Sequence, residues 1–149
     1  MAISFRYLAL EGDLPQPLIP VIFLNRISSK PILVGSLVDS GAEYTAITGI
    51  LAKRLELDLP ERRTKMYGVG GMIDVVETTC DIILGIPSEA YKIKIPVQVF
   101  VEDDEHRFPY PLLGRTDVFD HFDISFRQRK LKIDLRRMDS SLKRVEFPG

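Results

Sequence analysis

The chain has 149 residues, the usual length of one domain. Hydrophobic residues make up 45% of it and charged residues 28%, proportions that exclude a disordered chain, a collagen-like chain and a small disulfide-rich scaffold. The 20 basic and 21 acidic side chains give a formal net charge of −1, which offers no support for general binding to nucleic acids or membrane surfaces. Because the sequence has one cysteine, no recognisable signal peptide and no long apolar segment, we expect one soluble, cytoplasmic domain.

Short apolar runs separated by prolines and glycines dominate the sequence and are typical of an all-β chain. The strands that this pattern predicts, in chain order, are Ile3–Leu10, Pro20–Asn25, Pro31–Val38, Ala46–Thr48, Arg63–Tyr67, Met72–Leu84, Tyr91–Val101 and Asp123–Leu135. In the last of these, Leu131, Ile133 and Leu135 alternate with charged residues, which indicates a strand with one buried face. The run from Tyr91 to Val99 alternates in the same way over most of its length.

Two short helices are expected between the strands. The first, Thr48–Leu57, would begin at Thr48 or Gly49 as its cap. The residues expected to face inward from it are Ile50, Leu51 and Leu55. The second helix would span Arg115–His121, and the acidic run Glu102–Glu105 predicts a turn.

The most informative segment for function is Leu37–Ala42, in which two aliphatic residues lead into Asp-Ser-Gly-Ala. A strand that ends at Asp39 would hold this carboxylate at the tip of a loop, where functional groups tend to lie. Gly41 allows a tight turn and a close approach to a neighbour or ligand, and the Ser40 hydroxyl can fix the loop. The same residues also suit an ordinary turn between two strands, so the motif alone leaves both interpretations open.

Two segments farther along the chain add to this pattern. Tyr67–Met72 contains three glycines around one aliphatic residue, which suits the tip of a β-hairpin whose backbone amides reach a ligand. A phosphate-binding loop is disfavoured because the glycines do not open a helix and no Gly-Lys-Ser/Thr is present, whereas a plain hairpin turn remains open. Pro111–Phe119 places an apolar strand and a glycine before Arg115.

Taken together, the three segments resemble those of the retropepsin-like aspartic proteases, the retroviral-type, half-size relatives of pepsin. Leu37–Ala42 is similar to the catalytic loop of that family. Gly68–Gly71 is similar to the tip of its flap, and Leu112–Arg115 to the strand and helix near its C-terminus. The three matches occur in the family's order and at compatible spacing.

The resemblance covers most of the chain, from about Ile19 to Leu135. It implies a single domain over residues 1–149, folded as a closed β-barrel or sandwich with a flap hairpin and one or two short helices. Such a domain equals half of the two-lobed pepsin-like fold. Residues 1–18 and the basic tail 136–149 have no assigned counterpart.

The resemblance also implies a role for each site residue. Asp39 would be the catalytic aspartate, Ser40 would hydrogen-bond across a dimer axis to the partner's loop, and Gly41 would contact the substrate backbone. Glu43 and Arg115 would form an ion pair that braces the loop. The residues expected to contact substrate or to form the flap are Ala42, Tyr67, Gly68, Val69, Gly70 and Gly71.

Only one Asp-Ser-Gly occurs in the chain, whereas aspartic peptidases use two carboxylates. Two copies would therefore meet on a two-fold axis, each contributing its Asp39. The implied enzyme is a homodimeric aspartic endopeptidase in which two carboxylates about 3 Å apart share a proton and activate a water, with no metal or other cofactor. The alternative is a catalytically silent dimer that binds extended peptides or partner proteins.

Other reactive residues do not combine into a second site. His106 and His121 lack acidic residues at ligand spacing, so no metal site is predicted. Cys80 has no histidine partner and is expected to be a small buried residue. Ser40 lacks the Gly-x-Ser-x-Gly context of a serine nucleophile.

The C-terminal segment Phe126–Gly149 carries eight basic against three acidic side chains. Such a cluster would suit a nucleic-acid-binding arm, but the basic residues are not interleaved with aromatic ones. A solvated strand face and a frayed end are therefore favoured over nucleic-acid binding. The expected partners are a second copy of the chain and a peptide or protein substrate, with no membrane.

Overall fold

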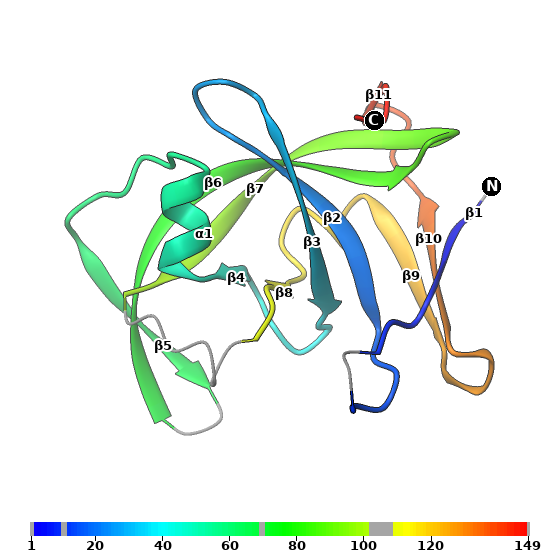
Figure 1. Ribbon diagram of the computed structural model, residues 1–149, viewed down its shortest axis with the longest axis horizontal. Coiled ribbons are helices and arrows are strands. Elements are labelled where there is room, and N and C mark those ends of the chain that lie inside the picture. Colours follow the sequence, from blue (N-terminus) through cyan, green and yellow to red (C-terminus); the bar gives the residue numbers. More distant parts are fainter. Residues whose placement is uncertain (1, 10–11, 69–70, 102–108, 149) are drawn as a thin grey trace.

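The computed structural model describes residues 2–9, 12–68, 71–101 and 109–148 (Figure 1). Strands account for most of the regular structure, which confirms the predicted all-β class. In chain order the elements are β1 (Ala2–Arg6), β2 (Leu18–Leu24), β3 (Pro31–Val38), β4 (Thr45–Ile47), α1 (Gly49–Arg54), β5 (Arg63–Gly68), β6 (Gly71–Ile86), β7 (Glu89–Phe100), β8 (Leu112–Leu113), β9 (Phe122–Arg127), a 3₁₀ turn (Gln128–Lys130), β10 (Lys132–Arg137) and β11 (Lys143–Val145). Within these ranges, no helix has the length and apolar character needed to cross a membrane.

The larger sheet closes on itself as a ring of strands. Its strand order is β11-β7-β4-β8-β3-β2-β6-β5, and β7 also pairs with β6, which joins the two sides of the sheet (Figure 1). Strands of such a ring turn one face inward, so alternate side chains fill the interior. Residues buried in the main core include Phe23, Ile47, Leu84, Ile95 and Leu113.

The β6–β7 hairpin forms one side of the ring, with register from Val75↔Phe100 to Ile86↔Glu89. The alternation predicted along β7 is confirmed, since every second side chain is buried. These buried residues are Tyr91, Ile93, Ile95, Val97 and Val99. Cys80 of β6 lies opposite Ile95 and is also buried, as expected, and this burial raises the pKa of its thiol to about 12.

A second, three-stranded sheet has the order β1-β10-β9. One of its faces packs on the core of the ring through buried side chains. These side chains are Ile3, Phe5, Phe122, Ile133 and Leu135. The first residues of the chain therefore belong to the same packed unit as the C-terminal strands.

The expectation of one long strand over Asp123–Leu135 is wrong. The chain reverses at Gln128–Lys130, and β9 and β10 pair with each other as an antiparallel hairpin. Leu131 has φ 53°, a left-handed conformation that ends the extended run, and it is 40% exposed rather than buried. The hydrophobic alternation continued through this point in the sequence, so it did not reveal the reversal.

The helix α1 is shorter than expected but begins where predicted. The Thr48 hydroxyl accepts a hydrogen bond from the Leu51 amide at 3.2 Å, which confirms Thr48 as the N-cap. Leu51 and Leu55 face the core, whereas Ile50 is 44% exposed and does not, contrary to expectation. A six-residue helix has only a narrow buried stripe, and Ala52 occupies the remaining inward position.

The second expected helix, Arg115–His121, is a series of turns instead. Asp117 has φ 65°, a conformation that regular helices exclude, and its amide donates to Asp120 Oδ2 at 2.8 Å. Isolated helix-like bonds remain, such as that from the Phe119 amide to the Arg115 carbonyl.

The basic C-terminal segment is not frayed within the residues described. β11 pairs with β7, and the Arg144 guanidinium donates to the Ser88 carbonyl at 2.7 Å. Val145 and Phe147 pack against a small buried cluster on the outside of the ring.

Candidate active site

Asp39 directly follows β3, and that end of the strand is held from both sides. On one side β3 runs parallel to β8, with the Asp39 amide donating to the Leu113 carbonyl at 3.0 Å. On the other side the Val38 amide donates to the Pro17 carbonyl at 3.0 Å. The backbone that carries the carboxylate is therefore fixed by neighbours far away in the sequence.

The loop after Asp39 is a tight turn built on the aspartate itself. The Gly41 amide donates to Asp39 Oδ1 at 2.9 Å, and the Ala42 amide donates to the Asp39 carbonyl at 3.2 Å. A Cβ on Gly41 would lie 3.3 Å from Asp39 Oδ1, a tight contact that a larger residue would relieve only by shifting this carboxylate. Ser40 and Gly41 are exposed and Asp39 is partly exposed, so a ligand can reach all three.

The far side of the loop is braced by the segment after β8. The Arg115 amide donates to the Ala42 carbonyl and the Thr116 amide to the Glu43 carbonyl, each at 2.9 Å. These bonds place Ala42 and Glu43 between the Asp39 loop and the chain that follows Leu113. The bracing predicted for Arg115 exists, but its backbone provides it.

The expected ion pair between Glu43 and Arg115 is absent. The ion pairs found among the described residues do not include it, and both side chains are exposed. An exposed pair gains little free energy against the entropy of holding two long side chains together. The sequence therefore predicted correctly that these two segments are in contact, but the contact is made by backbone atoms and not by the two charged side chains.

Thr45 and Gly114 hold the loop together, and no sequence motif indicates this role for Thr45. The buried Thr45 hydroxyl accepts a hydrogen bond from the Gly114 amide at 3.0 Å. A Cβ on Gly114 would lie 2.3 Å from the Tyr44 carbonyl carbon and 2.8 Å from the Thr45 nitrogen, so only glycine fits there. Gly114 belongs to the motif Pro111–Phe119, whereas Thr45 lies just outside the predicted strand Ala46–Thr48 and belongs to no motif.

The β5–β6 hairpin carries the glycines expected to form the flap. Gly68 and Gly71 face each other at its end, and Val69 and Gly70 lie outside the described residues. Tyr67 pairs with Met72 in the register, and these side chains are 81% and 53% exposed. Tyr67 is therefore not packed against the hairpin.

One charged contact lies across this hairpin. Lys65 and Asp74 face each other in the register, and Lys65 Nζ is 2.6 Å from Asp74 Oδ1. This hydrogen bond holds the pKa of the Asp74 carboxyl below its ordinary value.

A polar cavity of about 460 Å³ lies beside β3. Its lining residues are Gly12, Asp13, Leu14, Gln16 and Tyr110. Gln16 precedes Pro17 and Tyr110 precedes Pro111, and the carbonyls of both prolines accept amide hydrogen bonds from β3. The cavity therefore adjoins the strand that ends at Asp39.

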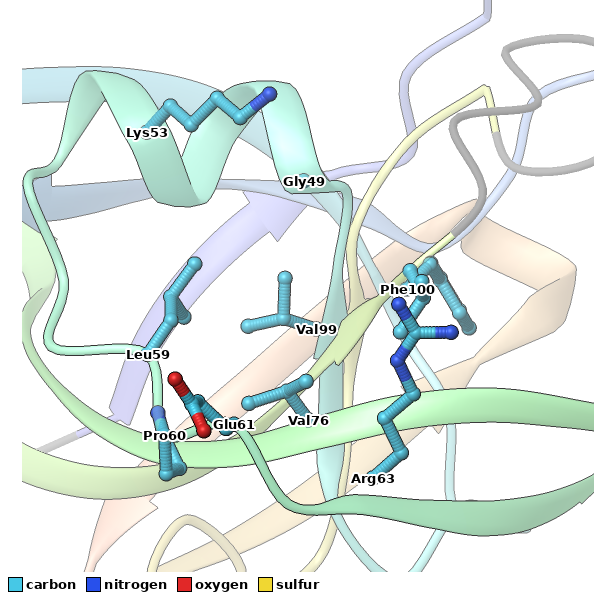
Figure 2. A pocket seen from close by; sticks show the side chains of 10 residues that line it. Gly49, Lys53, Leu59, Pro60, Glu61, Arg63, Val76, Val99 and Phe100 are labelled. Carbon is cyan, nitrogen blue, oxygen red and sulfur yellow. The ribbon is translucent and has the colours of Figure 1, made fainter.

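A second cavity of about 370 Å³ lies between α1 and strands β5, β6 and β7, as Figure 2 shows. Leu59, Val76 and Val99 give it an apolar floor, and charged side chains from α1 and from the start of β5 stand at its rim. Neither cavity has Asp39 among its lining residues.

The other titratable residues considered above do not form a reactive cluster. Among the described residues, no group of three or more metal-ligating side chains is placed to hold an ion. His121 Nδ1 lies 2.9 Å from Asp139 Oδ2 and is only partly exposed, whereas His106 lies outside the described residues. The Ser141 hydroxyl, more than His121, holds the pKa of Asp139 below its ordinary value.

The fold is similar to that of solved aspartic proteases. A retropepsin-like aspartic protease from Rickettsia conorii superposes with a TM-score of 0.59 at 17% identity, over 98% of this chain and 95% of that one. EIAV protease complexed with the inhibitor HBY-793 gives 0.42 at 21% identity over 72% and 88%, and the retroviral protease-like domain of Ddi1 from Leishmania major gives 0.48 at 14% over 85% and 97%. No protein-family model and no curated protein matches the sequence. The chain thus has a retropepsin-like fold, as its sequence predicted.

Proposed function

We propose that this chain is a homodimeric aspartic endopeptidase, with Asp39 of each copy forming the catalytic pair. The observation that carries the proposal is the position of Asp39 on a retropepsin-like fold, at the end of a strand where the Asp39 amide donates to the Leu113 carbonyl and the Val38 amide donates to the Pro17 carbonyl. Each copy supplies one such carboxylate, so a two-fold axis at this loop would bring two together.

The chemistry follows from two carboxylates sharing one proton. Carboxylates about 3 Å apart cannot both ionise cheaply, so one is charged and the other protonated. The charged carboxylate takes a proton from a bound water, whose oxygen attacks the scissile carbonyl carbon, while the protonated one gives its proton to the carbonyl oxygen. The resulting gem-diol collapses when the newly protonated carboxyl gives its proton to the amide nitrogen, the other carboxylate takes a proton from one gem-diol hydroxyl, and the carbon–nitrogen bond breaks. The pair ends the cycle with one proton.

The neighbouring residues take supporting roles in this proposal. The Gly41 amide already orients Asp39 Oδ1, and the exposed Ser40 hydroxyl is free to reach the loop of a second copy. Ala42 lies beside these residues, where a substrate backbone would pass. Glu43 and Arg115 hold the loop through their backbone atoms.

The β5–β6 hairpin would cover an extended substrate, which would lie between it and the catalytic loop as an added strand. The exposed Tyr67 side chain suits this role, because it has no packing to lose within its own chain. Gly68 and Gly71 belong to the hairpin end, and Val69 and Gly70 between them complete the proposed flap. The polar cavity next to β3 offers space for a substrate side chain.

The test is a peptide-library digest with the purified chain and its Asp39→Asn variant, at several pH values and protein concentrations. We expect cleavage with a bell-shaped pH profile, its loss in Asp39→Asn, and a specific rate that falls on dilution below the dimer dissociation constant. Asp58→Asn, the same change at an exposed aspartate away from the loop, is the matched control and should stay active.

Full activity of Asp39→Asn would overturn the proposal. Binding of library peptides by the unmodified chain with no cleavage at any pH would instead support the silent, peptide-binding dimer. A dimer structure would separate the two cases, because catalysis requires both Asp39 carboxylates to contact one bridging water.

A further inference from the structure

Three basic side chains, one from each strand, lie in a row on the outer face of the β1-β10-β9 sheet. Only the strand pairing, and not the sequence, shows that they are neighbours. In the antiparallel register Arg6 faces Lys132, and Lys132 faces Arg127. Directly paired residues of an antiparallel sheet project to the same face, so three basic side chains from three strands stand side by side. We call Arg6, Lys132 and Arg127 the cation row.

The cation row is only weakly neutralised within its own chain. Among the ion pairs of the described residues, one reaches it, from Arg127 Nη1 to Asp134 Oδ2 at 3.4 Å. Arg129 and Lys130, both exposed, lie in the turn directly beyond Arg127 and add to the positive charge. Like charges that face each other across strands destabilise a sheet, so an anion bound here would relieve a repulsion already present.

The positive charge of this face, and its lack of aromatic side chains among the described residues, limit the class of molecule that could bind to it. A second copy meeting it face to face would oppose cation to cation, which excludes self-association through the row. Nucleic acid is disfavoured because the aromatic residues of these strands, such as Phe5 and Phe126, occupy the opposite face in the register, leaving no base-stacking surface among the cations. A short run of carboxylates matches a short row of arginine and lysine side chains.

The cation row is connected to the catalytic loop through a short path of backbone contacts. The Tyr7 amide donates to the Leu131 carbonyl, Leu8 pairs with Gln16, and the Pro17 carbonyl accepts from the Val38 amide next to Asp39. Adding strand and inter-strand spacings along this path gives roughly 15–25 Å, or about five to eight residues of extended peptide.

We propose that the cation row is a docking site for an acidic segment of an extended peptide, displaced along the chain from the bond at Asp39. The role in substrate selection rests on the proposed endopeptidase function, whereas the binding itself does not. An endopeptidase built this way prefers protein substrates with several Asp or Glu residues about five to eight positions from the cleaved bond.

The test measures binding by fluorescence anisotropy with the full chain carrying Asp39→Asn, so that no cleavage consumes the probe. The probe is a fluorescein-labelled peptide of alternating Glu and Ser, with an otherwise identical Gln-Ser peptide as its neutral counterpart. The row is neutralised by Arg6→Gln, Arg127→Gln and Lys132→Gln together. The matched control removes the same charge from exposed cations elsewhere, by Arg54→Gln, Lys94→Gln and Lys143→Gln together.

We expect the row triple variant to weaken binding of the acidic peptide at least about tenfold at low salt, and the control triple variant to change it less than about twofold. The double variant Arg6→Lys and Arg127→Lys keeps the charge and should retain most of the affinity. It shows whether a loss of binding in the triple variant comes from the lost charge or from a disturbed fold. The Gln-Ser peptide should not bind detectably.

Equal losses in both triple variants, or equal binding of both peptides, would overturn the proposal. Tighter binding of a single-stranded oligonucleotide than of the acidic peptide, lost in the row triple variant, would also overturn it and point to nucleic acid. If the acidic peptide binds through the row but the unmodified chain cleaves nothing, the endopeptidase function fails while the docking site stands.

Discussion

The Asp39 loop and the β5–β6 hairpin are built in opposite ways. The loop is held by backbone hydrogen bonds to segments on both sides, including those that join Asp39 to Leu113 and Arg115 to Ala42. The hairpin packs against a small buried cluster through Met66 and Ile73, but near its end the side chains of Tyr67 and Met72 project into solvent.

This contrast suits the two tasks in the proposed reaction. A catalytic carboxylate works best when its surroundings fix it before the substrate arrives, because no reorganisation is then needed in the transition state. A covering hairpin has to move relative to the loop, and it can do so at low cost when few core contacts depend on it. Equivalent substitutions in the two regions should therefore have very different consequences for stability.

The largest expected effect is that of Gly114→Ala in the loop support. The new Cβ would collide with backbone atoms of Tyr44 and Thr45, which cannot move without displacing the loop. We expect the free energy of unfolding to fall by about 3 kcal/mol, measured by urea denaturation, with loss of any peptidase activity.

Gly35→Ala is the matched control within β3, since no atom lies within 4 Å of the position of its Cβ. It should leave stability unchanged or raise it by about 0.5 kcal/mol. Similar destabilisation by both substitutions would contradict the idea that Gly114 is required by close backbone packing.

The next largest effect should come from Thr45→Val, which keeps the shape of the side chain but removes the acceptor of the Gly114 amide. An unsatisfied buried amide costs about 1–3 kcal/mol of stability, and hydrogen exchange at the Gly114 amide should accelerate. Thr45→Ser loses a methyl group, worth about 1 kcal/mol, but keeps that amide protected. Equal exchange rates in the two variants would show that the hydroxyl does not anchor the loop.

In the hairpin, Tyr67→Ser should change the free energy of unfolding by no more than about 0.5 kcal/mol, because the side chain is 81% exposed. If the hairpin covers the substrate, KM for peptide cleavage should nevertheless rise several-fold. Met138→Ser, at an exposed methionine outside the hairpin, should affect neither quantity. A large loss of stability in Tyr67→Ser would remove the contrast between the two regions.

The smallest effect concerns the Lys65–Asp74 contact across the hairpin. Because Lys65 lowers the pKa of Asp74, this contact stabilises the hairpin fully above the ordinary aspartate value of 3.8 and is lost as the pH falls below it. Hydrogen-exchange protection of β5 and β6, corrected for the intrinsic rate, should therefore decline on acidification below that value. Asp74→Asn should remove this pH dependence, whereas Asp58→Asn should leave it in place.

The sequence was most informative where a local pattern of residues predicts the same element that the tertiary fold contains. The bounds of Pro31–Val38 agree with β3, Thr48 caps α1, and the alternation along β7 matches its burial. The loop motif was recognisable because Asp, Ser and Gly are residues that favour tight turns, and the Gly41 amide does bond to Asp39 Oδ1. Periodicity and turn chemistry are local properties, so one sequence reveals them.

The features that were missed depend on single backbone conformations or on distant atoms. The chain reverses direction after Arg127, and Leu131 in this reversal has a left-handed conformation. The expected helix after Arg115 is interrupted at Asp117, which is also left-handed. Neither leucine nor aspartate is a strong indicator of the left-handed conformation in a sequence. Thr45 matters because the Gly114 amide lies above it in space, 69 residues away along the chain. No pattern along the sequence contains that contact.

The burial of Cys80 has a practical consequence for measuring motion. It is the only cysteine in the sequence, and its thiol is both shielded and, with a pKa of about 12, almost entirely protonated near neutral pH. Maleimide dyes should therefore not react with Cys80 in the folded chain. They should react rapidly with a cysteine introduced at an exposed position such as Tyr67. The native protein already serves as an unlabelled background, so a single reporter of hairpin movement can be attached without first removing a competing thiol.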